Sequence, residues 1–179
     1  MNKNIFSVIL GLGATFTGAT ASGLKVGDPA PLFKLKTEEG KEFELSSRKG
    51  QGWTVLYFYP KAETPGCTKQ ACAFRDSISK IHEEGAEVYG ISADNVEAVA
   101  KFHKNHHLNF TLLADPKGEA IGPYGVKMPI IGIAKRWTFI VDPELKVRNI
   151  DNDVDPVKDA EKVGAMLKLL RAQDKSQSK

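Results

Sequence analysis

A single stretch, residues 53–81, constrains the fold of this chain most strongly. Residues 53–59 are apolar, aromatic or β-branched almost throughout, which predicts a buried strand. Pro60 ends that run, and after Thr64 the apolar residues recur three and four positions apart, which predicts an amphipathic helix. The stretch therefore predicts a strand, a short corner and a helix that packs against the sheet.

Both cysteines of the chain, Cys67 and Cys72, lie in this helix. Thr64-Pro65 is a good helix opening, because threonine can cap free amides through its hydroxyl and proline is tolerated at the first helical position. Cys67 then occupies the third position, where free amides and the positive end of the helix dipole favour a thiolate over a thiol. The position of Cys67 predicts chemical reactivity as well as burial.

One face of the same helix is expected to meet the sheet. Its apolar stripe consists of Cys67, Ala71, Phe74, Ile78 and Ile81. Cys72 follows one stripe member and is rotated by about 100° from that line, toward the flank of the helix.

The rest of the chain predicts an α/β fold: a central mixed sheet flanked by helices, with an N-terminal β-hairpin. The hairpin is expected at residues 32–35 and 41–45. A strand at 86–92 makes a parallel pair with 53–59, because a helix joins the two. Further strands are expected at 110–114, 136–141 and 146–150, and helices at 94–107 and 155–170. Asp94 is the expected cap of the first of these helices, and the stripe of the second is Val157, Ala160, Val163, Leu167 and Leu170.

Composition and the N-terminus suggest one exported domain. At 179 residues and a net charge of +3, with basic and acidic residues interleaved, the chain gives no support for nucleic-acid binding. Residues 1–21 contain Lys3, an apolar stretch and the cleavage-like Ala19-Thr20-Ala21, which predicts a secretory signal peptide. We expect a periplasmic or other extracytoplasmic domain at 22–173, a polar tail at 174–179, and no membrane contact after cleavage; an uncleaved tether is the alternative.

The spacing of the cysteines predicts a structural change. Residues five apart on a helix lie about 7.5 Å apart along its axis and roughly 140° apart around it, so their Cα atoms are roughly 8 to 9 Å apart. A disulfide needs Cα atoms within about 7 Å. If Cys67 and Cys72 join, the first turns of the helix must unwind, which predicts a folded form and a locally unfolded form.

Other interpretations of these residues stay open on spacing alone. Buried free cysteines often serve only as small apolar residues. A metal site is weaker, because the C-x₄-C spacing has no second ligand pair. His103 and His107 share a helical face with no acidic or cysteine ligand beside them, which favours a solvated helix end. No glycine-rich phosphate loop is present, so nucleotide binding has no support.

The residues around Cys67 resemble a known family. Pro60-x-x-x-Thr64-x-x-Cys67 matches the active-site pattern of the peroxiredoxins, and the segment 57–72 looks like their bacterioferritin comigratory protein (PrxQ) branch. The resemblance covers residues 26–170 and implies a thioredoxin-like fold. It also implies that Cys67 is the peroxidatic cysteine, that Cys72 is the resolving cysteine, and that Arg136 is the active-site arginine, although Arg-Trp-Thr-Phe replaces the usual Arg-Ser-Thr-Phe.

The resemblance implies thiol-dependent reduction of hydroperoxides without cofactor or metal. Cys67 would form a sulfenic acid, Cys72 would resolve it as a disulfide, and a thioredoxin-like or other dithiol protein would reduce that disulfide. Arg136 would stabilise the thiolate and bind peroxide oxygens, Thr64 would cap the helix or bond the peroxide, and Pro60 would keep the pocket dry. A monomer suffices for this cycle. The alternatives are a thiol-disulfide transfer protein without peroxidase activity and a catalytically silent interaction module.

Overall fold

The computed structural model describes residues 23–177, so the predicted signal peptide lies outside the described residues. The helical elements are η1 (Leu45–Arg48), α1 (Pro65–Glu83), α2 (Val96–Asn105) and α3 (Asp159–Gln177). The strands are β1 (Lys34–Thr37), β2 (Glu42–Glu44), β3 (Trp53–Phe58), β4 (Ala86–Ser92), β5 (Thr111–Ala114), β6 (Trp137–Val141) and β7 (Val147–Asp151).

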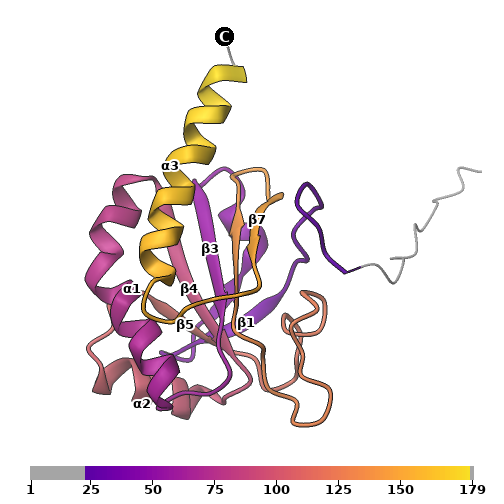
Figure 1. Cartoon of the computed structure of the whole chain (residues 1–179). Coiled ribbons are helices and arrows are strands. Elements are labelled where there is room, and N and C mark those ends of the chain that lie inside the picture. The colour runs from indigo at the N-terminus through magenta and orange to yellow at the C-terminus, as the bar shows by residue number, and fades with distance from the viewer. Residues whose placement is uncertain (1–22, 178–179) are drawn as a thin grey trace, which may run out of the picture.

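The strands form one mixed sheet in the order β2-β1-β5-β4-β3-β6-β7 (Figure 1). β3 pairs in parallel with β4, and β4 pairs in parallel with β5, whereas the other pairs are antiparallel. The predicted N-terminal hairpin is present as β1 and β2, and the predicted parallel crossover runs from β3 through α1 to β4. The mixed sheet flanked by helices is therefore confirmed.

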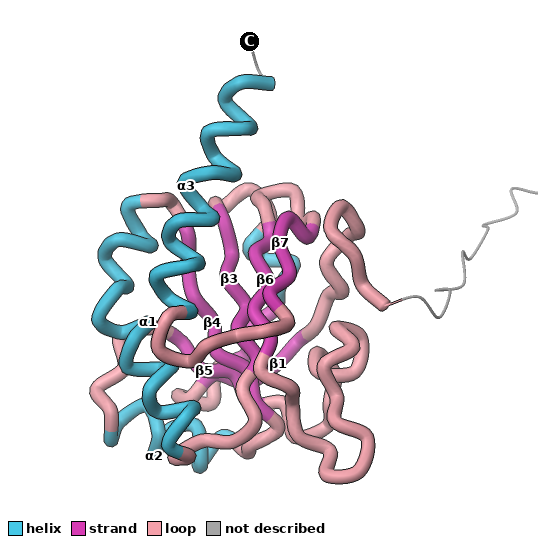
Figure 2. The backbone as a smooth tube through the Cα atoms, in the orientation of Figure 1, coloured by secondary structure: helices cyan, strands magenta, loops and turns pink. Residues whose placement is uncertain are grey.

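The sheet separates two apolar cores. Alternate residues of the fully buried strand β3 point to opposite faces, so Val55 and Tyr57 join one core and Leu56 and Phe58 join the other. The first core lies under α1, α2 and α3, and Figure 2 shows α1 and α3 next to each other in front of the strands. The second core is covered by η1, the N-terminal segment and the loop between β5 and β6. β3 is thus the central strand from which the chain enters α1.

The opening of α2 differs from the prediction. Asn95, and not Asp94, caps the helix, and its side chain accepts a hydrogen bond from the Ala98 amide at 2.9 Å. The Asp94 carboxylate instead accepts from the Ala62 amide at 2.8 Å and from the Ser92 hydroxyl at 2.9 Å. Asp94 therefore fastens the corner before α1 to the end of β4, a long-range role that local spacing does not reveal.

α3 also begins and ends later than predicted. Residues 155–158 form a turn, closed by a hydrogen bond from the Lys158 amide to the Asp155 carbonyl at 3.1 Å, and the helix starts at Asp159. Val157 therefore lies outside the helix and is exposed, while the other four predicted stripe residues, Ala160, Val163, Leu167 and Leu170, are buried. The expected polar tail is helical as far as Gln177.

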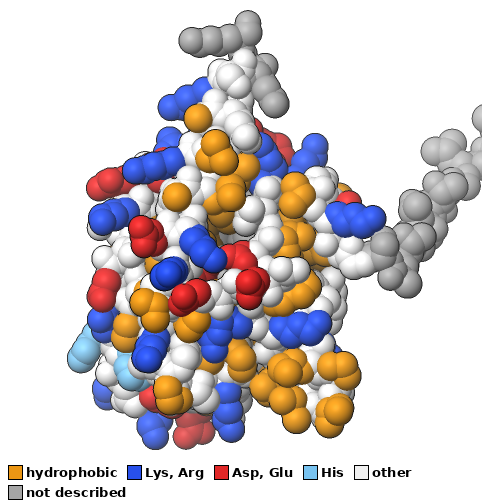
Figure 3. Space-filling model, viewed as in Figure 1, with side chains coloured by type: hydrophobic (Ala, Val, Ile, Leu, Met, Phe, Trp, Pro, Cys, Tyr) orange, Lys and Arg blue, Asp and Glu red, His pale blue; other side chains and the backbone are white. Residues whose placement is uncertain are grey.

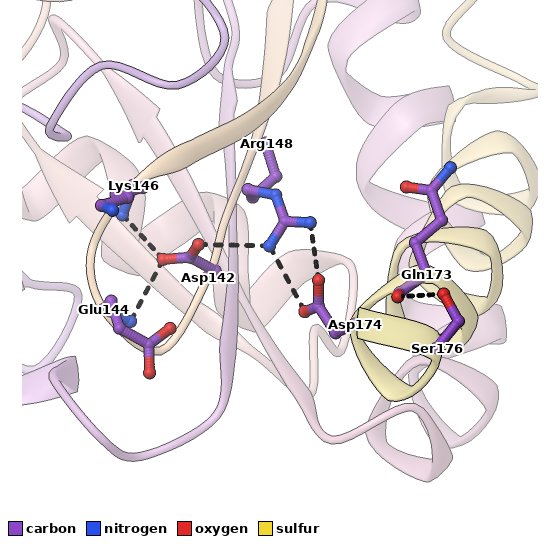
Figure 4. A network of polar contacts seen from close by, with 7 residues as sticks. All are labelled: Asp142, Glu144, Lys146, Arg148, Gln173, Asp174 and Ser176. Carbon is purple, nitrogen blue, oxygen red and sulfur yellow. Dashed lines mark hydrogen bonds and ion pairs between the residues drawn. The ribbon is translucent and has the colours of Figure 1, made fainter. Parts of the chain in front are cut away.

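An arginine fastens the far end of α3 to the sheet (Figure 4). Arg148 on β7 donates to the Asp174 carboxylate at 2.7 Å and 3.3 Å and to the Asp142 carboxylate at 3.3 Å. Asp142 follows β6 and also accepts from the amides of Glu144 and Lys146. In the last turn the Ser176 hydroxyl donates to the Gln173 carbonyl at 2.6 Å. The C-terminal helix is therefore attached to strands β6 and β7.

The loop before β6 carries two exposed isoleucines, Ile130 and Ile131. Ile130 is 97% exposed and Ile131 is 60% exposed. Hydrophobic side chains gather over this loop at the lower right of the space-filling view (Figure 3). Within residues 23–177, no helix has the length and apolar character required to cross a membrane.

Candidate active site

Cys67 lies at the start of α1, where the chain turns away from β3. Thr64 occupies the cap position, Pro65 opens the helix, and Cys67 is the third helical residue, as predicted. The Cys67 side chain is only 1% exposed, and the whole predicted stripe of α1 is buried against the sheet. The sulfur therefore sits at the positive end of a helix in a nearly dry environment.

Thr64 does not cap α1 through its side chain. Its hydroxyl donates to the Lys61 carbonyl at 2.9 Å, and no hydrogen bond links that hydroxyl to a helix amide. The expectation of a side-chain cap is therefore wrong, because the hydroxyl closes the tight turn that leads into the helix. Glu63 in this turn has a left-handed backbone with φ 62°, and its carboxylate contacts His106 at 2.9 Å and Asn105 at 2.8 Å. These contacts fix the corner beside Cys67.

Arg136 is the charged partner of Cys67. Its Nη2 donates to the Cys67 Sγ at 3.4 Å, across 69 positions of the sequence. Gly66 leaves room for this approach, because a Cβ at that residue would lie 3.1 Å from Arg136 Nη2. The structure thus brings together a buried sulfur, a helix N-terminus and a permanent positive charge; the charge and the helix N-terminus both stabilise a thiolate.

A buried polar chain continues behind Arg136. Arg136 Nη1 donates to Gln70 Oε1 at 2.6 Å, and Gln70 Nε2 donates to Asp159 Oδ2 at 2.6 Å. The Thr138 hydroxyl donates to the same Asp159 oxygen at 2.8 Å. Sequence reasoning missed Gln70, Asp159 and Thr138. Gln70 left a signal, since it is a polar residue three positions after Cys67 on the inward side of the helix, whereas Asp159 left none.

Aromatic side chains line the sheet under α1. The Tyr57 ring stacks on Phe74 with centroids 4.7 Å apart, and it contacts the Tyr59 ring at 5.6 Å. Both tyrosines are fully buried, and burial raises the pKa of Tyr57 well above its ordinary value, so it stays neutral. Pro60 follows these rings and is half-buried beside the corner. Tyr57, Tyr59 and Phe74 form an aromatic floor that keeps water away from the first turns of α1.

Cys72 lies on the flank of α1 and is half-buried. Its thiol is free, as is that of Cys67, and the intervening segment is regular helix. The structure therefore does not bring Cys72 to Cys67 in this form, and helix geometry places their Cα atoms roughly 8 to 9 Å apart.

Two histidines near the end of α2 have acidic neighbours. His103 lies 3.7 Å from Glu38, and His106 lies 2.9 Å from Glu63. In the part of the chain that the structure describes, no three histidine, cysteine or acidic side chains gather closely enough to hold a metal ion.

A family model described as "AhpC/TSA family" matches residues 26–150. The chain belongs to the peroxiredoxins of the AhpC/TSA family. A wheat (Triticum aestivum) relative named "Peroxiredoxin Q, chloroplastic" is 41% identical over 160 residues, which cover 88% of this chain and 72% of the relative. This peroxiredoxin therefore resembles the peroxiredoxin Q branch along most of its length.

Solved structures support the same placement. The crystal structure of peroxidoxin BcpB from Mycobacterium tuberculosis superposes with a TM-score of 0.77 at 37% identity and covers 82% of this peroxiredoxin and 97% of that chain. The bacterioferritin comigratory protein of Xanthomonas campestris gives a TM-score of 0.73 at 28% identity and covers 82% of this peroxiredoxin and 96% of that chain. The thioredoxin-like fold is therefore confirmed.

Proposed function

We propose that Cys67 and Cys72 carry the activity of this thiol-dependent peroxidase, with Cys67 as the peroxidatic and Cys72 as the resolving cysteine. The contact of Arg136 Nη2 with the Cys67 sulfur at 3.4 Å carries the proposal. A cysteine that only packs in the core needs no arginine beside it, whereas a thiolate nucleophile is stabilised by the charge of the half-buried Arg136.

In the first step the Cys67 thiolate attacks one oxygen of a hydroperoxide. A sulfur–oxygen bond forms, the oxygen–oxygen bond breaks, and the departing oxygen takes a proton to leave as water or an alcohol. Negative charge moves from sulfur to the departing oxygen, so Arg136 stabilises the charge at both ends of the step. The helix amides near Gly66 and the Thr64 hydroxyl oxygen supply further polar contacts to the peroxide, and Pro60 shields the site.

In the second step the sulfur of Cys72 attacks the Cys67 sulfenic acid. A disulfide forms and the hydroxyl leaves as water, after the first turns of α1 unwind. A thioredoxin-like or other dithiol protein then reduces the disulfide by thiol–disulfide exchange, which returns two protons and two electrons. The substrate is hydrogen peroxide or an organic hydroperoxide; alkyl peroxide reduction activity is attributed to the bacterioferritin comigratory protein of X. campestris.

Peroxide consumption by cysteine variants tests these roles. Reduced wild-type protein and a dithiol reductant should consume peroxide catalytically, and Cys67→Ser should abolish consumption. Cys72→Ser should complete the first step and accumulate a sulfenic or over-oxidised Cys67, visible by mass spectrometry. Sustained consumption in Cys67→Ser contradicts the peroxidatic assignment. A disulfide-exchange activity that survives without any peroxide consumption favours the alternative, a thiol-disulfide transfer protein.

We also propose that residues 1–21 act as a secretory signal and that a monomeric domain from residue 22 works outside the cytoplasm. The apolar stretch and the Ala19-Thr20-Ala21 site support this proposal. The wheat relative carries a chloroplast designation, which belongs to that protein. The intact mass of the protein expressed from the full chain in a bacterial host tests the proposal: we expect a mature N-terminus near Ser22 in the exported fraction. A chain that retains residues 1–21 in the cytosol contradicts it.

A further inference from the structure

Gln70 lies at the centre of the buried polar chain and between the two cysteines. The side chain is fully buried, with its carbonyl oxygen on Arg136 Nη1 and its amide nitrogen on Asp159 Oδ2, both at 2.6 Å. It therefore joins α1 to the site arginine, which immediately precedes β6, and to the C-terminal helix. The segment that must unwind to join Cys67 and Cys72 contains this residue.

Asp159 directs its carboxylate away from its own helix. The residue begins α3 and is 1% exposed, and its Oδ2 accepts hydrogen bonds from Gln70 of α1 and Thr138 of β6. Its Oδ1 is buried and has no hydrogen-bond partner among the described residues. The Asp159 carboxylate therefore connects the start of α3 to α1 and β6.

The carboxylate also decides which way the Gln70 amide faces. An ionised carboxylate can only accept hydrogen bonds, so Gln70 must present its NH₂ group to Asp159. The carbonyl oxygen of Gln70 then faces Arg136, which can only donate. Asp159 thereby provides Arg136 with an acceptor that keeps the guanidinium beside the Cys67 sulfur.

We propose that Asp159 is a positioning residue that holds the first turns of α1 in the helical form through Gln70. Unwinding between Cys67 and Cys72 moves the Gln70 backbone, so the bonds to Asp159 and Arg136 break together with the helix. The Asp159–Gln70 contact thus sets how readily the thiol of Cys72 reaches Cys67. The inference rests on the proposed disulfide cycle for its purpose, but the contact itself acts in the reduced protein without peroxide.

Hydrogen exchange of the reduced protein tests the proposal. In Asp159→Asn the carboxylate is replaced by an amide that can donate or accept, so the Gln70 amide is no longer fixed. We expect the amides of residues 68–72 to exchange roughly tenfold faster than in the wild type, the scale of one lost charge-assisted hydrogen bond. We expect alkylation of Cys67 by iodoacetamide to slow several-fold, because Arg136 loses its acceptor.

Two further variants separate positioning from general destabilisation. Gln70→Met removes the contact between Gln70 and Asp159 from the α1 side. In the double variant, which combines Gln70→Met with Asp159→Asn, the amides of residues 68–72 should exchange no faster than in Gln70→Met alone. Glu42→Gln is the control for the loss of a carboxylate charge, since its side chain lies on the exposed strand β2 and pairs with Lys34 at 3.0 Å. It should leave the amide exchange of residues 68–72 and the alkylation rate of Cys67 at wild-type values. If Asp159→Asn does not fold, Thr138→Val takes its place in the comparison with Gln70→Met, because it removes the other hydrogen bond to Asp159 Oδ2.

Three outcomes overturn the proposal: wild-type exchange of residues 68–72 in Asp159→Asn, equal acceleration throughout the chain, or additive effects in the double variant. None of these measurements uses peroxide. If hydrogen exchange contradicts the role of Asp159, the peroxidase assignment is unaffected. If the cysteine variants contradict the proposed catalytic roles, the hydrogen-exchange test of Asp159 can still be interpreted.

Discussion

Arg136 serves two acceptors at once because its guanidinium is planar and forked. One terminal nitrogen contacts the Cys67 sulfur and the other donates to Gln70. A lysine at this position would offer a point charge without the fixed geometry of a fork. The contact between Arg136 and the Cys67 sulfur therefore depends on the space available around the guanidinium.

The space between Gly66 and the Arg136 guanidinium is small. In Gly66→Ala the new methyl group would lie 3.1 Å from Arg136 Nη2 and 3.8 Å from its Cζ. We expect the guanidinium to move away from the Cys67 sulfur and the rate of Cys67 alkylation or peroxide reaction to fall about fivefold, the equivalent of about 1 kcal/mol. Competition kinetics against a peroxidase of known rate measure this change.

Gly164→Ala on α3 is the control, because nothing lies within 4 Å of the added methyl group. It should leave Cys67 reactivity unchanged and raise the free energy of unfolding by roughly 0.5–1 kcal/mol through helix propensity. If Cys67 reacts at the wild-type rate in Gly66→Ala, the position of the Arg136 guanidinium does not depend on the absence of a side chain at residue 66.

Asp159 gives the stability of the protein a specific pH dependence. Burial raises the pKa of Asp159 above its ordinary value of 3.8; neighbouring Asp151 also raises it, while Gln70, Thr138 and Lys162 lower it. A carboxyl with a raised pKa favours the folded state most when protonated, so its contribution is complete below pH 3.8 and is lost as the pH rises through the raised value.

The comparison of wild type with Asp159→Asn isolates this effect. We expect the free energy of unfolding of the wild type, relative to the variant, to fall as the pH rises above 3.8 and to level off once Asp159 is ionised. Urea denaturation from about pH 3 to about pH 7 measures the difference. A difference that is constant or rises over that range contradicts the raised pKa.

At the scale of the elements, β3 and α1 pack together through the aromatic floor. Gly90 on β4 leaves the space for Tyr57, since a Cβ at Gly90 would lie 2.6 Å from the Tyr57 ring and hydroxyl and 2.7 Å from Leu112. Tyr57 in turn stacks on Phe74 of α1. The glycine therefore controls how closely α1 rests on the sheet.

Gly90→Ala should destabilise the protein by about 1–3 kcal/mol, because the ring cannot yield without moving α1 or β5. Thermal or urea denaturation measures the loss. Gly118→Ala is a poor control because its φ is +77°, whereas Gly164→Ala again adds a methyl group into open space. Wild-type stability in Gly90→Ala would mean that the aromatic floor adjusts at no cost.

The elements with strong periodicity could be predicted from the sequence, and the long-range contacts could not. The stripe of α1 and the apolar run of β3 predicted the corner that holds Cys67, because burial imposes the helical and strand periods directly. Thr64 and Asp94 were misassigned because their side chains bond to carbonyls and amides outside the local helix start. Asp159 was missed because a contact across 89 positions leaves no local pattern.

At the scale of the whole molecule, α3 is attached to the rest of the fold at both ends. Asp159 holds its beginning near the active site, and Arg148 holds its end through Asp174. Arg148 also lies over the Trp53 ring, 5.3 Å from its centroid. The helix thereby connects the site to the far ends of β3 and β7.

Arg148→Met should lower the free energy of unfolding by about 1–3 kcal/mol, because the buried Asp142 carboxylate loses a charged donor. Lys34→Met on the exposed hairpin is the matched control: its ion pairs with Glu42 and Glu44 are solvent-exposed, and its removal should change stability by less than about 0.5 kcal/mol. Urea denaturation of both variants measures the contrast. Equal effects would contradict an anchoring role for Arg148.

The roles proposed for the two cysteines require α1 to exist in two forms, a helix that presents the Cys67 thiolate and an opened segment that lets Cys72 reach it. Hydrogen exchange of residues 68–72, before and after one equivalent of hydrogen peroxide, tests this requirement most directly. We predict protected amides in the reduced protein and loss of that protection when a Cys67–Cys72 disulfide forms, while residues 78–83 stay protected. Unchanged protection of residues 68–72, or cysteines that remain unlinked after oxidation, would contradict it.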